Sequence, residues 1–160
     1  MILYHGSNVA VKEPKIIISD RKLDFGTGFY LTSDFDQAKR WAVLTTDRRK
    51  SGVPVISVYT FNNSAMDILK VKLFQKPDSE WLKYAAWNRN DPNAADDYDL
   101  VARPVANDKT SPVLAAYFAG IYDEDETIKR LMPEKLKDQY ALKTQAALDN
   151  LEFSKVIYVR

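Results

Sequence analysis

The chain has 160 residues, of which none is cysteine and one, His5, is histidine. Without cysteine, disulfide frameworks, thiolate nucleophiles and cysteine-based zinc sites are excluded. A single histidine also excludes a metal site built from several histidines, including the His-Glu-x-x-His motif. Any chemistry must therefore come from carboxylates, amides, hydroxyls, aromatic rings, the backbone and one imidazole.

An excess of charge of one sign and a long apolar run are also missing. The 23 Lys and Arg residues nearly balance the 22 Asp and Glu residues, which leaves a formal net charge of +1. Such a balance argues against binding to nucleic acid or to a membrane. No apolar run approaches the roughly 18 residues that span a bilayer. His5, Lys12, Glu13 and Lys15 interrupt the N-terminal segment before a signal-peptide core forms. The expectation is a cytoplasmic protein, with export by a leaderless route left open.

Short apolar segments alternate with amphipathic patterns, without a repeat and without a linker between two apolar halves. This organisation predicts one α+β domain over residues 1–160. The clearest strand is 55–61, rich in β-branched and aromatic residues, and the clearest helix is 35–46, which follows the N-cap pair Ser33-Asp34. Further strands are expected at 2–4, 29–32, 68–74, 98–101, 139–143 and 155–159, with 15–19 as a loop or edge strand. Further helices are expected from residue 77 onward and at 112–122, 124–131 and 145–150, with a loop at 88–97.

Two short motifs are candidates for chemistry. His5-Gly6-Ser7 ends the first strand, and alone it is typical of a half-buried histidine before a turn glycine. Gly26-Thr27-Gly28 precedes Tyr30, and a glycine pair lets the backbone approach a ligand closely, although a hairpin turn uses the same pair. The aromatic residues with helical spacing are expected in the core: Trp41, Trp81, Tyr84 and Trp87. The basic cluster Arg48-Arg49-Lys50 is expected in a solvated loop, with contact to an anionic substrate as the alternative.

Four ordered blocks carry a resemblance to known proteins: Tyr4–Ser7, Gly28–Thr32, Tyr98–Asp108 and Asp138–Leu148. Together they resemble the bacterial family of unknown function DUF3990. The first two blocks also look like the ADP-ribosyltransferase superfamily, in the branch of the poly(ADP-ribose) polymerases and diphtheria-type toxins with a His-Tyr-Glu triad. The resemblance implies a split β-sandwich with flanking helices around an NAD cleft. It implies NAD as the ADP-ribose donor and no metal.

The resemblance also implies roles for individual residues. His5 would bond a ribose hydroxyl of NAD, the backbone of Gly6 would hold the nicotinamide carboxamide, and Ser7 would add a hydroxyl. Tyr30 would stack on the nicotinamide ring, since an aromatic face attracts a planar cation. Gly28 and Thr32 belong to the same NAD-binding block as Tyr30. In the related family a glycine usually precedes Pro104, whereas Arg103 stands here, which argues against a close backbone contact. Pro104 is expected in a turn, and Asn107 and Asp108 at the mouth of the cleft.

The third triad position departs from the superfamily, because Gln139 stands where a catalytic glutamate is expected. A glutamate stabilises the oxocarbenium-like cation that forms when the nicotinamide–ribose bond breaks. An amide keeps a hydrogen bond but carries no charge, and losing such a group costs about 2.7–4 kcal/mol, or about 10²–10³ in rate. Three readings stay open: Gln139 suffices with a strong nucleophile, a carboxylate substitutes (Asp138, Glu134 or Glu152), or NAD binds without turnover. Strand alternation makes Asp138 a poor substitute.

The leading hypothesis is a mono-ADP-ribosyltransferase in which His5, Tyr30 and Gln139 form a variant triad. By analogy, it would act as a toxin or defence effector with a cognate neutralising protein, and a protein or small-molecule acceptor is favoured over nucleic acid. The first alternative is an NAD- or ADP-ribose-binding module without turnover. The second is a structural protein-interaction domain.

Overall fold

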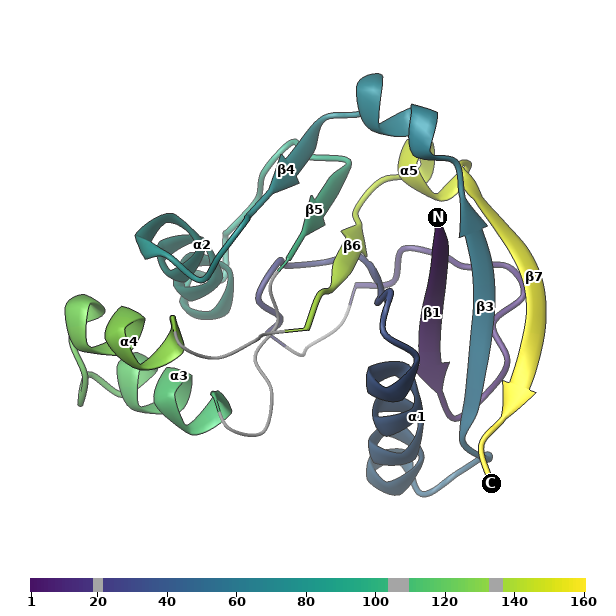
Figure 1. The fold of residues 1–160 in the computed structure, drawn as a ribbon, viewed down its shortest axis with the longest axis horizontal. Coiled ribbons are helices and arrows are strands. Elements are labelled where there is room, and N and C mark those ends of the chain that lie inside the picture. Colours follow the sequence, from purple (N-terminus) through teal and green to yellow (C-terminus); the bar gives the residue numbers. More distant parts are fainter. Residues whose placement is uncertain (19–21, 104–109, 133–136) are drawn as a thin grey trace.

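The computed structural model describes residues 1–18, 22–103, 110–132 and 137–160, and these form an α+β fold with two sheets (Figure 1). Sheet A is antiparallel and has the order β1 (Ile2–Ser7), β3 (Val55–Phe61), β7 (Leu151–Tyr158). Sheet B has the order β2 (Phe29–Leu31), β6 (Tyr140–Leu142), β5 (Leu100–Ala102), β4 (Val71–Leu73), and only β4 and β5 are parallel. The predicted fold class is therefore confirmed.

Helix α1 (Phe35–Arg49) lies along β1 of sheet A (Figure 1). It begins where the Asp34 carboxylate accepts the Gln37 N–H at 2.8 Å, which satisfies a free donor of the first turn. Its buried residues Ala38 and Ala42 face Gly6, where a Cβ atom would lie 1.9 Å from the Ala38 carbonyl oxygen. Strand β1 runs through Ser7, so Gly6 is a strand glycine that allows helix contact, not the predicted turn glycine.

Sheet B buries both of its faces. On the face toward sheet A, Leu31, Leu100 and Leu142 join a cluster with Leu3 and Tyr59 of sheet A. On the other face the cluster contains Val101 and Ala141 of the sheet and side chains of the three outer helices. These helices are α2 (Ser79–Asn90), α3 (Ser111–Phe118) and α4 (Glu124–Leu131) (Figure 1). The short η1 (Asn63–Asp67) and α5 (Gln145–Leu148) connect the two sheets along the chain.

Some expected boundaries are wrong. Strand β7 begins at residue 151 rather than 155, β4 covers only residues 71–73 of the expected 68–74, and residues 88–90 belong to α2 rather than to a loop. Arg48 and Arg49 form the last turn of α1 rather than a solvated loop, since basic side chains stabilise a helix C-terminus. Residues 15–18 have no regular structure and belong to a segment that covers sheet A, where Tyr59 donates a hydrogen bond to the Val11 carbonyl oxygen. Within the described ranges, no helix is both long and apolar enough to cross a bilayer.

Candidate functional site

The two sheets meet where β1 approaches β2. Tyr4 and Thr32 exchange two backbone hydrogen bonds, of 2.8 and 3.0 Å, and form an isolated antiparallel bridge. Residues 4–7, 30–33 and 138–140 surround this point, and we call them the β1–β2–β6 junction. The junction brings together His5, Gly6, Ser7, Tyr30, Thr32 and Gln139, which the sequence separates by more than a hundred positions.

The His5 ring is held in one orientation. It stacks on Phe29 with ring centroids 4.4 Å apart, and its Nδ1 lies 2.8 Å from the Tyr30 carbonyl oxygen. Because a carbonyl oxygen only accepts, Nδ1 carries the proton. Burial lowers the pKa of His5, the bond to Tyr30 partly offsets this, and the charge of Arg49 lowers the pKa further. The imidazole is therefore neutral at pH 7, and its Nε2 is a hydrogen-bond acceptor.

Gly6 presents backbone groups at the edge of sheet A. In an antiparallel strand the N–H and C=O of one residue point to one side, and those of the next residue point to the other. Tyr4 directs these groups toward Thr32 of the bridge, so Gly6, two residues later, directs its own toward the same side. In the described part of the chain, the Tyr4–Thr32 bridge is isolated and does not extend to Gly6. A donor and an acceptor on one edge match the two polar groups of a carboxamide.

The Tyr30 side chain is tied to the glycine turn that precedes β2. Its hydroxyl donates to the Gly26 carbonyl oxygen at 2.6 Å and accepts from the Phe25 N–H at 3.2 Å. Gly26 has φ +76°, a conformation that favours glycine. Burial is the main cause of the raised pKa of Tyr30, so the hydroxyl stays protonated. The Tyr30 ring packs with the outer-helix cluster, whereas Phe29 and the His5 ring stacked on it lie on the opposite face of β2.

Gln139 is the residue of the junction with an unmet hydrogen-bonding group. The residue is 5% exposed, and its buried Nε2 has no hydrogen-bond partner among the described residues. Leu31 pairs with Tyr140, so continued register places Gln139 opposite Thr32 and on the face of sheet B that carries Tyr30. Leaving a buried donor unpaired costs about 1–3 kcal/mol, which a ligand with an acceptor atom would recover.

The neighbouring carboxylate of Asp138 is fully engaged. It accepts from the Thr32 hydroxyl at 3.0 Å, from the Ser33 N–H at 2.8 Å and from the Ser33 hydroxyl. The Gln37 amide donates to the Asp138 carbonyl oxygen at 2.8 Å, which joins α1 to the same segment. Asp138 therefore connects β6 to the end of β2 and does not substitute for a catalytic glutamate.

The remaining predicted site residues have structural contacts. A Cβ atom on Gly28 would lie 3.0 Å from the Leu142 carbonyl oxygen, so glycine allows β2 to approach β6. The Thr32 hydroxyl accepts the Asp34 N–H at 3.0 Å at the start of α1. The Ser7 hydroxyl donates to Asn8 Oδ1 at 3.4 Å. Glu134 and the block 104–109, with Asn107 and Asp108, lie outside the described residues.

A buried polar network beneath the glycine turn was not found from the sequence. Lys143 Nζ lies 2.7 Å from Asp96 Oδ2, with both side chains about nine-tenths buried, and the Tyr84 hydroxyl donates to the same carboxylate at 2.5 Å. A second pair, Arg89 and Asp24, lies at the same turn. The members are common residue types, and they follow no regular spacing in the sequence. No sequence signal would therefore have identified the network.

Two of the four aromatic residues expected in the core differ: Trp87 is 37% exposed, and Trp41 is half-buried. Trp81 is fully buried, but Trp41 is half-buried and belongs to none of the three clusters in the described ranges. It lies one helical turn after Gln37, on the same side of α1. Because Gln37 contacts Asp138 and Thr32, this side of the helix faces the junction.

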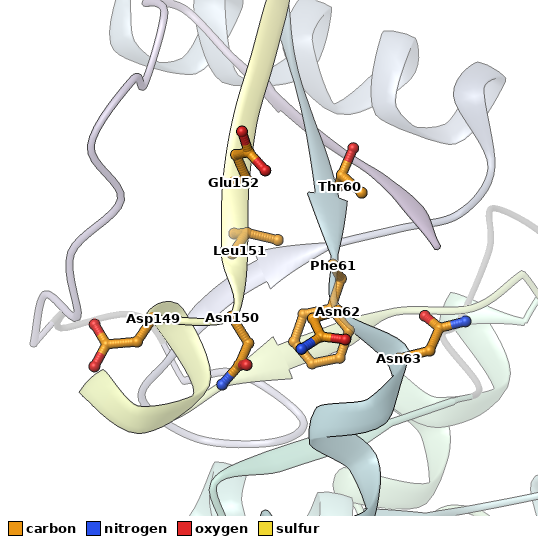
Figure 2. Close-up of a pocket in the computed structure, with 8 residues that line it drawn as sticks. All are labelled: Thr60, Phe61, Asn62, Asn63, Asp149, Asn150, Leu151 and Glu152. Atoms are coloured by element: carbon orange, nitrogen blue, oxygen red, sulfur yellow. The ribbon is translucent and has the colours of Figure 1, made fainter.

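A separate open depression lies where β3 ends and β7 begins (Figure 2), and we call it the edge depression. It has a volume of about 730 Å³ and is lined by Thr60, Phe61, Asn62, Asn63, Asp149, Asn150, Leu151 and Glu152. On β3, Ser57 pairs with His5 of β1. Glu152 of β7 pairs with Thr60, which lies three residues further along β3. Glu152 therefore lies outside the junction. In the part of the chain that the structure describes, no group of three or more acidic or histidine side chains is arranged to hold a metal ion.

Comparison with known proteins gives one finding. No curated protein and no solved structure matches the chain. The family described as "Protein of unknown function (DUF3990)" matches residues 1–153, which is nearly the whole length. The chain belongs to the DUF3990 family.

Proposed function

We propose that the chain is an NAD-dependent mono-ADP-ribosyltransferase with an ADP-ribosyltransferase-like fold, in which the β1–β2–β6 junction binds NAD. The observation that carries the proposal is the buried amide Nε2 of Gln139, which has no hydrogen-bond partner among the described residues. It lies on the same face of sheet B as the Tyr30 ring, and among the described residues the Tyr4–Thr32 bridge does not extend to the backbone of Gly6. Unmet polar groups beside an aromatic ring are typical of a binding site for a polar, planar ligand.

The residues at the junction fit the chemistry of NAD. Gly6 offers a donor and an acceptor to the carboxamide, and the neutral His5 offers Nε2 to a ribose hydroxyl. The half-buried Tyr30 and Trp41 would contact the cationic pyridinium, which aromatic faces attract. Gln139 would hold the nicotinamide ribose while the glycosidic bond breaks. With an amide there instead of a carboxylate, turnover would be about 10²–10³ slower than with glutamate.

The second candidate is an NAD- or ADP-ribose-binding module that does not catalyse transfer. One observation favours it: Gln139 is uncharged, and the adjacent carboxylate of Asp138 is already bonded to Thr32 and Ser33. Under either function, the partners would be NAD or ADP-ribose, and for the transferase also an acceptor and a cognate neutralising protein. A toxin or defence role in the cytoplasm belongs to the proposal and rests on analogy.

The test is release of nicotinamide from NAD, combined with calorimetric titration with NAD. We expect binding and slow release by the natural chain, and faster release by Gln139→Glu, because a carboxylate stabilises the developing cation. The matched control is Gln145→Glu, the same change at an exposed position on α5. Binding without release, with or without lysate as acceptor, supports the second candidate. An absence of NAD binding contradicts both.

A further inference from the structure

The hydroxyl of Tyr30 is held by the backbone of the turn that precedes β2. It donates to the Gly26 carbonyl oxygen at 2.6 Å and accepts the Phe25 N–H at 3.2 Å. A phenol hydroxyl has one proton to donate, so the first bond uses its donor and the second uses an acceptor lone pair. The direction in which the Tyr30 ring points therefore depends on where residues 24–26 lie.

Arg89, in the last turn of α2, connects this turn to the outer helices. Its Nε donates to the carboxylate of Asp24, the residue that precedes Phe25. Asp24 is 5% exposed, so its charge requires a partner in the protein, and Arg89 supplies one. The Arg89 guanidinium also lies 5.2 Å from the ring centroid of Phe118 on α3, which restricts its own position.

A second contact, of a different kind, also holds the turn. The Phe25 side chain is fully buried in the outer-helix cluster, and its ring centroid lies 6.1 Å from that of Phe74. Apolar burial has no preferred direction, whereas a charge-assisted hydrogen bond has one. Loss of the Arg89 bond should therefore reorient the turn, while Phe25 keeps it attached to the core.

We propose that Arg89 is a positioning residue for the NAD site. Its bond to Asp24 sets the orientation of the turn, and the turn sets the angle of the Tyr30 ring on which nicotinamide stacks. This inference rests on the proposed function. Contact between two flat rings depends on the angle between them, so a tilted Tyr30 ring binds nicotinamide less well. Arg89 acts through Tyr30 and needs no contact with NAD.

The experiment is a double-mutant cycle read by calorimetric titration with NAD. Arg89→Gln and Tyr30→Phe should each raise the Kd about 10-fold, because both leave the ring without its fixed angle. In the Tyr30→Phe background, Arg89→Gln should raise the Kd less than about 2-fold, because the ring no longer bonds to the turn. NMR of ring-labelled tyrosine, with Tyr30→Phe as the assignment, should show faster rotation of the Tyr30 ring in Arg89→Gln.

Arg130→Gln is the matched control. Arg130 also donates through Nε to a carboxylate, that of Glu126 at 2.7 Å, and its guanidinium also lies over an aromatic ring, 4.5 Å from the centroid of Tyr122. This pair belongs to α4. The control should keep the natural Kd and the natural rotation rate of the Tyr30 ring.

A charge-free variant separates positioning from stability. Arg89→Gln combined with Asp24→Asn leaves no buried charge without a partner, so the chain stays folded, and its Kd should rise as in Arg89→Gln alone. An unchanged Kd in both Arg89 variants overturns the proposal, as does an equal effect of Arg89→Gln with and without the Tyr30 hydroxyl, or an unchanged rotation rate. An absence of NAD binding by the natural chain instead contradicts the proposed function, and the inference falls with it.

Discussion

The edge depression and the β1–β2–β6 junction differ in how their polar side chains are hydrogen-bonded, and this difference distinguishes a surface depression from a candidate binding site. Two polar side chains that line the open depression (Figure 2) bond to neighbouring groups: Asn62 accepts the Ser64 N–H at 3.2 Å, and Asn150 donates to the Ala146 carbonyl oxygen at 2.9 Å. The junction is partly buried, yet Gln139 has a buried donor without a partner in the described ranges. Polar side chains that form hydrogen bonds with neighbouring residues stabilise turns. A buried polar group without a hydrogen-bond partner instead costs stability and indicates a ligand-binding site.

The comparison also applies to two adjacent residues of the junction. Asp138 has three hydrogen-bond donors around its carboxylate, whereas the Gln139 Nε2, which is itself a donor, has no acceptor among the described residues. One residue therefore holds the strands together, and the other is available for binding. Substitutions at the two positions should change stability in opposite directions.

The largest effect is expected at the glycine that lets α1 contact β1. In Gly6→Ala the new Cβ would lie 1.9 Å from the Ala38 oxygen and 2.8 Å from the Ala42 nitrogen, both backbone atoms of α1. The helix must shift, and we expect the free energy of unfolding in urea to fall by about 3 kcal/mol. Gly120→Ala is the control, because its Cβ meets nothing within 4 Å. It retains only the strain of φ +75°, about 1 kcal/mol. Equal losses would show that α1 does not require Gly6.

The next largest effect is expected at Asp138. Asp138→Ala removes the acceptor for Thr32 and Ser33, and bonds to a charged group contribute about 1.5–3 kcal/mol each at most, so we expect a loss of about 2 kcal/mol. Chemical denaturation measures this change. Asp97→Ala, which breaks an exposed ion pair with Lys70, should change stability little. If Asp138→Ala abolished nicotinamide release without loss of stability, Asp138 would be catalytic rather than structural.

A smaller effect of opposite sign is expected at Gln139. Gln139→Leu replaces the unpartnered amide by an apolar side chain of similar size, so the free energy of unfolding should rise by about 1 kcal/mol. Binding of NAD should weaken at the same time, as calorimetry would detect. In the edge depression, Asn62→Ala removes the cap of η1 and should lower stability by about 1 kcal/mol without changing NAD binding. A loss of stability in Gln139→Leu would mean that the amide has a partner after all.

Much of the fold follows from local patterns in the sequence. The run 55–61 and the Asp34 cap predict β3 and the start of α1, because β-branched residues and a capping carboxylate act within a few residues. The length of β1 does not follow, since Gly6 reads as a turn residue until α1 is placed against it. Tertiary contact decides the conformation there.

Local sequence patterns predict only part of the candidate site. The motif around His5 and the block around Tyr30 mark two of its strands. The bond between Asp138 and Ser33 spans 105 residues, and the missing partner of Gln139 is a property of the packed junction. Strand alternation predicted Asp138 and Gln139 to differ in role, but only the contacts show that the carboxylate is already bonded.

The smallest effect is a pH dependence that reports on the junction alone, because His5 is the sole histidine. Burial lowers its pKa below the ordinary value of 6.5, so the folded state binds a proton less readily than the unfolded state. The stability from the neutral ring is therefore complete above pH 6.5 and is lost as the pH falls through the lower pKa of the folded state. We expect the difference in free energy of unfolding between the natural chain and His5→Gln to decrease between pH 7 and pH 5.5. Urea denaturation at several pH values, with the imidazole followed by NMR, measures it. The edge depression has no histidine, so Asn62→Ala should show no such change, and a pH-independent difference for His5→Gln would contradict the buried neutral ring.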